Sequence, residues 1–405
     1  MRKLILILVC IGLLSLPFSA MAATEAQKQA AIDAGLAFLA LQQQASGAIG
    51  SYEIASTAAA VLAFAEEGST ISGGPYQGVV QNALNYILNN AISTPIAVQP
   101  AGNPDSNANN IGVKWQIWGN EDLYVTGLAV PAIVKGGTSS SVVAGGSQAG
   151  RTYADVVRDA VDLFAFAQNE PAWGRGGWRY TPNYGNSDNS VSQWPVIGFL
   201  YSGQWGINPP QWVKDELVNW VNYIQSASGG SGYTQPNEWV NPGKTGGLLL
   251  QHQFLGIATA DPRVQNALNY LKNMWNTYGS EGVFGDAYMM WAIYKGLEVT
   301  IGLDNMTTII PRLQGGAVID NPNHGWNWWE DYCEYLVSTQ DLASGAWWNG
   351  GSWVDWSLAT PWYINILAAT QVPGPGGEVP EPATMILLGS GLVGLAGYAR
   401  RRMKK

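Results

Sequence analysis

Carboxylates precede most of the apolar helical segments of the sequence, and they are the residues best suited to chemistry. Glu53, Asp122, Asp188, Asp286 and Asp355 each stand at or just before a run of small and apolar residues. Two carboxylates at one site can act as acid and as base or nucleophile, which is the chemistry of glycoside cleavage. A carboxylate at a helix N-terminus can instead cap free backbone amides and interact with the helix dipole. The sequence leaves both interpretations open.

Aromatic residues accompany these carboxylates. The 405-residue chain has 19 Trp and 18 Tyr, which is a high content for its length. Aromatic side chains that come with Gly and Asn in loops can line a cleft for sugars or apolar ligands. The candidates for such a cleft are Trp178, Tyr180, Trp194, Trp353 and Trp356.

The elements that must position these residues repeat along the chain. Six amphipathic segments alternate with six segments that are apolar almost all round, and a helix without a polar face is buried on all sides. The predicted pairs are 31–41 with 54–64, 79–88 with 123–134, 156–167 with 191–201, 213–225 with 247–257, 264–275 with 287–297, and 329–339 with 358–369. The near-identity of residues 81–88 (QNALNYIL) and 265–272 (QNALNYLK) supports a true repeat. The pattern predicts an all-α fold, an (α/α)6 toroid of six helix pairs over residues 23–373.

A toroid would bring the inner N-termini, and with them the carboxylates and aromatic side chains, to one mouth. The fourth unit departs from the pattern, because it has Lys244-Thr245 where the other units have an acid. The insertions at 91–120 and 136–150 could form part of a lid or be simple loops.

The two ends of the chain carry targeting signals. Two basic residues and a short apolar run precede a small-x-small pattern, which predicts a signal peptide over residues 1–22. A linker at 374–378 leads to Pro380-Glu381-Pro382, an apolar segment at 383–399 predicted to cross the membrane, and Arg400-Arg401-Arg402. A plain single-span anchor is the alternative interpretation of this C-terminus.

Residues 379–405 resemble the PEP-CTERM sorting signal in the order of motif, span and basic tail. The signal peptide predicts export with removal by signal peptidase, and the resemblance implies recognition by an exosortase, with cleavage near Pro380, Glu381 and Pro382. It also implies an inner-membrane intermediate, followed by delivery to the cell surface or the extracellular matrix of a Gram-negative bacterium that makes exopolysaccharide.

The body resembles the toroids of terpenoid cyclases and protein prenyltransferases. Their loops carry a Gln-x-x-x-Gly-x-aromatic pattern, which is similar to the loops beginning at Gln43, Gln225 and Gln340. The segment 177–191 looks like the loop of bacterial prenyltransferase and squalene oxidase repeats. In that family the loop Gln and aromatic residue tie neighbouring repeats together.

The sequence lacks the motifs that the known activities of that family require. The sequence contains no Asp-x-Asp-Asp string, and Glu121-Asp122 is too short for an aspartate-rich diphosphate motif. Asp331-x-Cys333 lies on an outer segment with no histidine after it, so no zinc site is expected. The net charge of −9 argues against nucleic acid as a partner. We therefore expect no cofactor and no metal.

The sequence predicts an exported surface or matrix protein whose aromatic, acidic cavity binds a glycan or an apolar ligand, without catalysis. Exosortase, signal peptidase, the membrane and an exopolysaccharide or other glycan are the expected partners. The alternative is a glycan-cleaving hydrolase or lyase that uses two of the five carboxylates.

Overall fold

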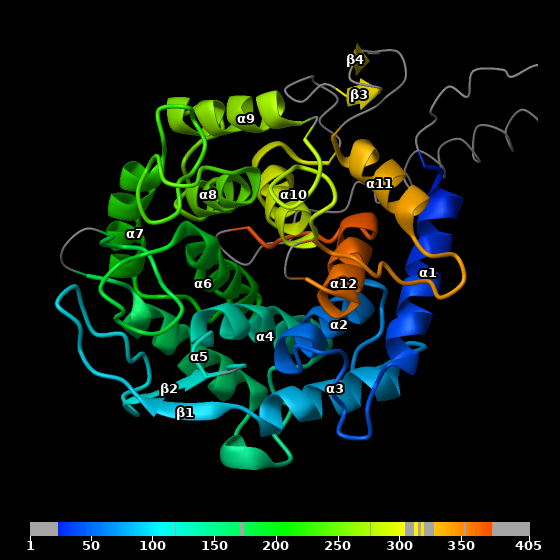
Figure 1. Cartoon of the computed structure of the whole chain (residues 1–405). Helices are drawn as coiled ribbons and strands as arrows, with labels where there is room; N and C mark the ends of the chain where they lie inside the picture. Colours follow the sequence, from blue (N-terminus) through cyan, green and yellow to red (C-terminus); the bar gives the residue numbers. More distant parts are fainter. Residues whose placement is uncertain are drawn as a thin grey trace, which may run out of the picture.

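A computed structural model describes most of the body of the chain. The described residues are 23–117, 119–170, 174–275, 277–303, 312–314, 317–319, 328–351 and 354–374. They form twelve α-helices in two concentric rings (Figure 1). The outer helices are α1 (Glu25–Leu41), α3 (Gln77–Asn89), α5 (Tyr153–Ala167), α7 (Gln211–Ile224), α9 (Pro262–Met274) and α11 (Trp328–Thr339). The inner helices are α2 (Ile54–Glu66), α4 (Asp122–Gly136), α6 (Asn189–Ser202), α8 (Pro242–Phe254), α10 (Ala287–Ile301) and α12 (Trp356–Leu367).

The inner ring is closed. Each inner helix contacts the next one along the chain, and α12 packs against α2 and α1. Nearly every residue of α2, α6 and α10 is buried, whereas α7 buries one stripe at helical spacing, Val213, Leu217 and Trp220 among it. The six predicted helix pairs are therefore present, and burial divides them into outer and inner helices as their apolar patterns indicate.

Two helices begin five or six residues before their predicted starts, whereas the other ten begin within three residues of theirs. Helix α1 begins at Glu25 because Thr24 and Gln27 form a capping box in front of it. Helix α8 begins at Pro242, behind an Asn241 cap, although its first turns are rich in glycine. Those glycines serve packing: a Cβ on Gly246 or Gly296 would collide with the backbone of the facing helix, so α8 and α10 lie unusually close.

A glutamine at the end of four outer helices links each repeat to the next. Its side-chain amide donates to the carbonyl of a glycine in its own loop and to a carbonyl near the start of the following outer helix. The donors and their acceptors on that next helix are Gln43 to Val79 (2.8 Å), Gln168 to Val213 (3.0 Å), Gln225 to Arg263 (2.8 Å) and Gln340 to Ala31 (2.8 Å). The last of these bonds joins the end of the ring to its beginning.

The partner glycines lie at the same contact. Gly47, Gly176, Gly229 and Gly345 all have positive φ, and a Cβ on any of them would collide with a carbonyl of the next outer helix. Only glycine combines that backbone conformation with so close an approach. The glutamine and glycine together therefore fix the spacing between neighbouring outer helices.

The loops are also tied to the inner helices. In five repeats, a backbone N–H group of the loop between the outer and the inner helix donates to a Ser or Thr hydroxyl on the first turns of the inner helix. The donor and acceptor residues are Ile49 with Thr57, Trp115 with Thr126, Trp178 with Ser192, Ser231 with Thr245, and Trp347 with Thr360. The start of each of these inner helices is thereby held in place relative to its outer helix.

Two short antiparallel strand pairs among the described residues lie on the outside of the toroid. β1 (Ile92–Pro95) and β2 (Ile111–Lys114) form an antiparallel hairpin within the first insertion, and β2 packs against α5. β3 (Arg312–Gln314) pairs with β4 (Ala317–Ile319). The first insertion, residues 91–120, therefore mostly covers the outer helix α5. Near its end, Ile117 reaches a central cavity between the inner helices. The second insertion folds against α3, where Ser147 donates to the carbonyl of Ala91.

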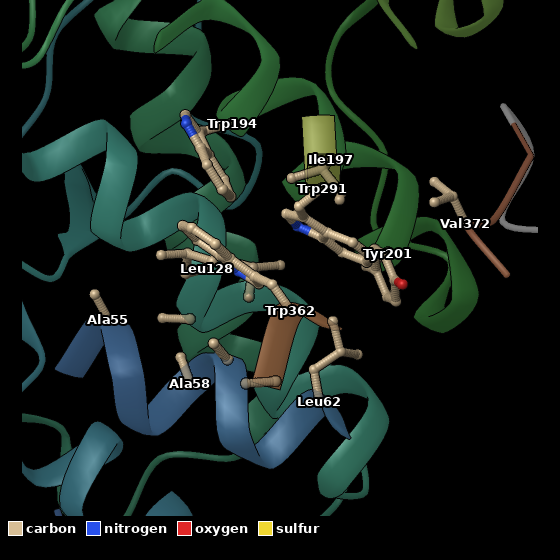
Figure 2. Packing of buried hydrophobic residues seen from close by; sticks show 14 of the residues in the cluster. Ala55, Ala58, Leu62, Leu128, Trp194, Ile197, Tyr201, Trp291, Trp362 and Val372 are labelled. Atoms are coloured by element: carbon tan, nitrogen blue, oxygen red, sulfur yellow. The ribbon is translucent and has the colours of Figure 1, made fainter. Parts of the chain in front are cut away.

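The C-terminal part of the body closes one end of the inner ring. Tyr294 donates to the carbonyl of Thr370 (2.9 Å), and the N–H of Val372 donates to Glu298 (3.2 Å). Val372 is buried and lies near Tyr201 of α6 (Figure 2). Residues 370–372 thus cover the end at which the inner helices finish.

Gln340→Ala tests the ring-closing bond. The substitution removes the hydrogen bonds to the buried carbonyl groups of Ala31 and Gly345, and the loss of each costs about 1–2 kcal/mol. We expect the free energy of unfolding in urea to fall by about 2–4 kcal/mol. The control is Gln211→Ala, because the exposed Gln211 side chain bonds only within its own helix, to Asp215. Equal small losses in the two variants would contradict the role assigned to Gln340.

Candidate functional site

A cavity of about 500 Å³ opens at the end where the inner helices begin. All six inner helices or the residues just before them contribute to its wall. Among the described lining residues are five tyrosines and two tryptophans: Tyr52, Tyr124, Tyr180, Tyr233, Tyr288, Trp239 and Trp362. The N-termini of the inner helices therefore meet at one mouth.

Aromatic rings in contact with one another form much of the wall. The ring of Tyr124 lies 6.4 Å from that of Tyr180 in a stacked arrangement and 6.2 Å from that of Tyr288. At the rim, Trp239 packs edge-on against Tyr233 at 5.4 Å. These rings give the cavity flat apolar surfaces with hydroxyl groups at their ends.

Trp362 lines the floor of the cavity and packs on a tryptophan from the opposite side of the inner ring. Trp194 of α6 and Trp362 of α12 stack at 6.2 Å, with Leu128 of α4 beside them (Figure 2). Below them the Lys295 ammonium lies 4.3 Å from the Trp194 ring, and burial lowers the pKa of this lysine to about 7. The amide of Gln193 accepts from Lys295 and donates to the hydroxyl of Tyr288. The space beneath the floor is therefore filled by side chains.

Three of the predicted carboxylates cap their own inner helices. Asp188 accepts the N–H of Ser190 (2.7 Å), Asp286 that of Met289 (3.1 Å) and Asp355 that of Ser357 (2.9 Å). Asp188 is completely buried, and this burial raises the pKa of its carboxyl, while the hydrogen bond from Ser190 opposes the shift. The capping interpretation is confirmed for these three residues, and Asp286 also lines the cavity.

The other two carboxylates have different partners. Asp122 is buried and pairs with Lys114 at 2.7 Å. Burial raises the pKa of Asp122, and Lys114 opposes that shift. Glu53 is exposed, makes no capping hydrogen bond, and accepts the hydroxyl of Tyr86 (3.2 Å). Neither residue is among those that line the cavity.

The carboxylates that do reach the cavity are Asp286, Glu121 and Glu281. Glu121 directly precedes Asp122, and Glu281 accepts the indole N–H of Trp239 at the rim. The predicted ring of acids is thus only partly formed by the residues predicted for it.

The predicted aromatic residues divide in the same way. Tyr180 lines the cavity, whereas Trp194 is buried behind the lining residues Tyr124 and Trp362 and is not part of the lining itself. Trp178 is fully buried between α5 and α6, where its indole donates to the carbonyl of Phe164 (2.8 Å). Trp356 packs edge-on against Phe38 of the outer helix α1. Trp353 lies outside the described residues.

Sequence reasoning missed most of the tyrosines that line the cavity. Tyr124 and Tyr288 each follow an inner-helix acid by two positions, in Asp122-Leu-Tyr124 and Asp286-Ala-Tyr288, and that spacing could have identified them. Tyr233 and Trp239 come from a loop, and their spacing gave no signal.

The fourth unit follows the general pattern with a neutral cap. Asn241 accepts the N–H of Lys244 (3.0 Å) and so occupies the position that an acid has elsewhere. The Lys244 ammonium lies 4.4 Å from the ring centroid of Trp239 and 5.7 Å from that of Tyr233. Burial lowers the pKa of Lys244 to about 8, and nearby carboxylates, Asp188 foremost, oppose this shift. The cavity therefore carries a cation among aromatic faces.

The described part of the chain contains neither a cluster of metal-binding side chains nor a helix suited to span a membrane. There, no three His, Cys, Asp or Glu side chains gather as they would around a metal ion. None of the helices described is both long and apolar enough to cross a membrane. The predicted signal peptide, the spanning segment 383–399 and the sorting residues Pro380, Glu381, Pro382, Arg400, Arg401 and Arg402 all lie outside the described residues.

Comparisons with known proteins bear on the two parts of the chain separately. Residues 378–402 match the PEP-CTERM protein-sorting motif, as their resemblance predicted. This motif implies processing by an exosortase and sorting of an exported protein to the cell surface. No curated protein matches the sequence.

Three solved structures similar to the body are toroidal enzymes. The type II terpene cyclase MstE from Scytonema has a TM-score of 0.48 at 13% identity, covering 85% of this chain and 98% of that one. The Candida albicans protein geranylgeranyltransferase-I has a TM-score of 0.47 at 11% identity, covering 82% and 90%. The GH76A alpha-1,6-mannanase from Salegentibacter sp. HEL1_6 has a TM-score of 0.49 at 12% identity, covering 85% and 98%. At these identities the likeness concerns the arrangement of helices and not the chemistry.

Lys244→Met tests the cation in the cavity. Lys244 has a pKa of about 10.5 in the unfolded chain and about 8 in the folded protein. Below pH 8 the folded protein must bind this proton in a buried site, and this lowers its stability; the loss disappears as the pH rises from 8 to 10.5. The stability of the native protein should therefore rise relative to that of the variant by about 2–3 kcal/mol between pH 7 and 10.5. Urea unfolding at several pH values measures it, with Lys272→Met, on the exposed face of α9, as control. A constant difference across this range would contradict a depressed pKa at Lys244.

Proposed function

We propose that this exported protein uses its central cavity to bind a segment of a glycan without cleaving it. The observation that carries the proposal is the wall of five tyrosines and two tryptophans around a cavity of about 500 Å³. This volume is within the range typical of small-molecule binding sites, and such sites are usually lined by aromatic and apolar side chains with a few polar groups. The sorting motif supports the proposal because it implies delivery to the cell surface, where exopolysaccharide would be found.

The chemistry of the wall suits a sugar. The C–H face of a pyranose packs on an aromatic ring, while its hydroxyl groups need donors and acceptors around the edge. Tyr124, Tyr180 and Tyr288 offer both a ring and a hydroxyl, and Asn241 and Ser190 add polar groups at the same end. An apolar ligand would use the same rings but would make no use of the polar groups of the wall, Asn241 and Ser190 among them.

The carboxylates favour binding over cleavage. Glycoside hydrolysis needs two carboxyl groups free to exchange protons or attack the sugar. Asp188, Asp286 and Asp355 hold their helix N-termini, and Asp122 is paired with Lys114. Their first role is therefore structural.

A glycan-cleaving enzyme is the second candidate, because Asp286, Glu121 and Glu281 line the cavity. Two of these carboxyl groups about 5–10 Å apart across a bound sugar would fit a retaining or inverting mechanism. Such an enzyme would release new reducing ends, and Asp286→Asn would abolish their release.

Tyr180→Ala tests the binding surface. Loss of one ring contact is worth about 1 kcal/mol or more, so the affinity for a bound oligosaccharide should fall about tenfold. Calorimetric titration of the full-length protein in detergent measures the change. Tyr223→Ala, on the outer face of α7, should leave the affinity unchanged. Unchanged affinity in Tyr180→Ala would contradict the assignment of the cavity as the binding site. The appearance of new reducing ends during the titration would favour a glycan-cleaving enzyme.

A further inference from the structure

A second hollow of about 320 Å³ lies beside the central cavity, at the same end of the toroid. Its described lining comes from the last two turns of α11, the loop leading to α12, Tyr363 of α12, and the residue just before Asp286. The side chains of Tyr335, Thr339, Asp341, Trp348 and Asn349 contribute to it.

Trp348 is exposed but held in one orientation. More than half of its surface, 54%, is open to solvent. Its indole N–H donates to Asp341 (2.9 Å), and its ring packs edge-on against Phe38 at 5.5 Å. An exposed aromatic ring with a fixed orientation is well suited to stack on a ligand, because little side-chain entropy is lost on binding.

The polar side of the hollow is anionic. Asp341 accepts the hydroxyl of Ser344 (2.6 Å) and the indole of Trp348, and these hydrogen bonds hold the pKa of Asp341 below its usual value. No lysine or arginine is among its described lining residues. A fixed carboxylate without a neighbouring cation accepts hydrogen bonds from hydroxyl groups and repels anions, so the hollow fits a neutral sugar better than a uronic acid.

Residues that are adjacent in the chain line the hollow and the central cavity. Gly285 lines the hollow, whereas the next residue, Asp286, lines the cavity. The backbone N–H of Ala287 donates to the carbonyl of Gly350 (2.7 Å), which joins this segment to the loop that carries Trp348. One extended ligand could therefore contact both places.

We propose that this hollow is a second sugar-binding subsite, in which Trp348 stacks on further units of the same neutral glycan that occupies the central cavity. The inference rests on the proposed function, because it assumes a glycan in the cavity. It adds that the protein prefers long neutral chains to short ones.

The test compares chain lengths. Neutral gluco-, manno- and galacto-oligosaccharides are titrated into the full-length protein in detergent, as disaccharides and as hexasaccharides. The native protein should bind a hexasaccharide at least tenfold more tightly than the matching disaccharide. Trp348→Ala should remove most of this advantage and leave disaccharide binding unchanged, whereas Trp348→Phe should keep part of it. Tyr180→Ala should weaken the binding of both lengths.

The outcomes separate the two proposals. If Trp348→Ala leaves hexasaccharide binding unchanged, or weakens both lengths equally, the second subsite is overturned while the central cavity remains a glycan site. If none of the oligosaccharides binds to the native protein, the proposed function fails and the subsite fails with it. Because Trp348 is exposed, its substitution should preserve the fold, and the far-ultraviolet circular dichroism of each variant checks this.

Discussion

The toroid depends on a glutamine amide that binds two backbone carbonyls at once, one in its own loop and one on the next outer helix. Each of Gln43, Gln168, Gln225 and Gln340 makes this pair of bonds. The glycine that supplies the first carbonyl has positive φ and lies directly against that next helix. Because the Gln340 bond returns to α1, the same interaction that spaces the repeats also closes the ring. The closed ring brings all six inner N-termini to a single mouth, so the cavity is a consequence of the spacing of the repeats.

That geometry also constrains the chemistry. The inner N-termini need acceptors for their free N–H groups, and Asp188, Asp286, Asp355 and Asn241 provide them. The acids that look catalytic in the sequence are thus largely engaged by the fold. Residues in the first turn of each inner helix line the cavity, and two of them, Tyr124 and Tyr288, are aromatic. Recognition by aromatic faces therefore arises more directly from this architecture than proton transfer does.

Much of this fold could be predicted from the sequence, because helical periodicity and burial are local properties. The glutamine loops at Gln43, Gln225 and Gln340 were also recognisable by their spacing. Gln168 was not, since a longer loop separates it from Gly176. The start of α8 was missed because its glycines serve close packing with α10, which a sequence pattern does not reveal. Tyr233 and Trp239 could not be assigned to the cavity, because their position depends on how a loop folds over the mouth.

The most direct test of non-catalytic glycan binding is to incubate the full-length protein with a panel of oligosaccharides, and to measure both binding and the integrity of the recovered sugar by mass spectrometry. We expect at least one oligosaccharide to bind and to be recovered at its original length. Recovery of shorter products would contradict non-catalytic binding and would make the carboxylates that line the cavity, Asp286 among them, the acid and base to examine. Failure of every oligosaccharide to bind would contradict the assignment of the aromatic cavity to a glycan.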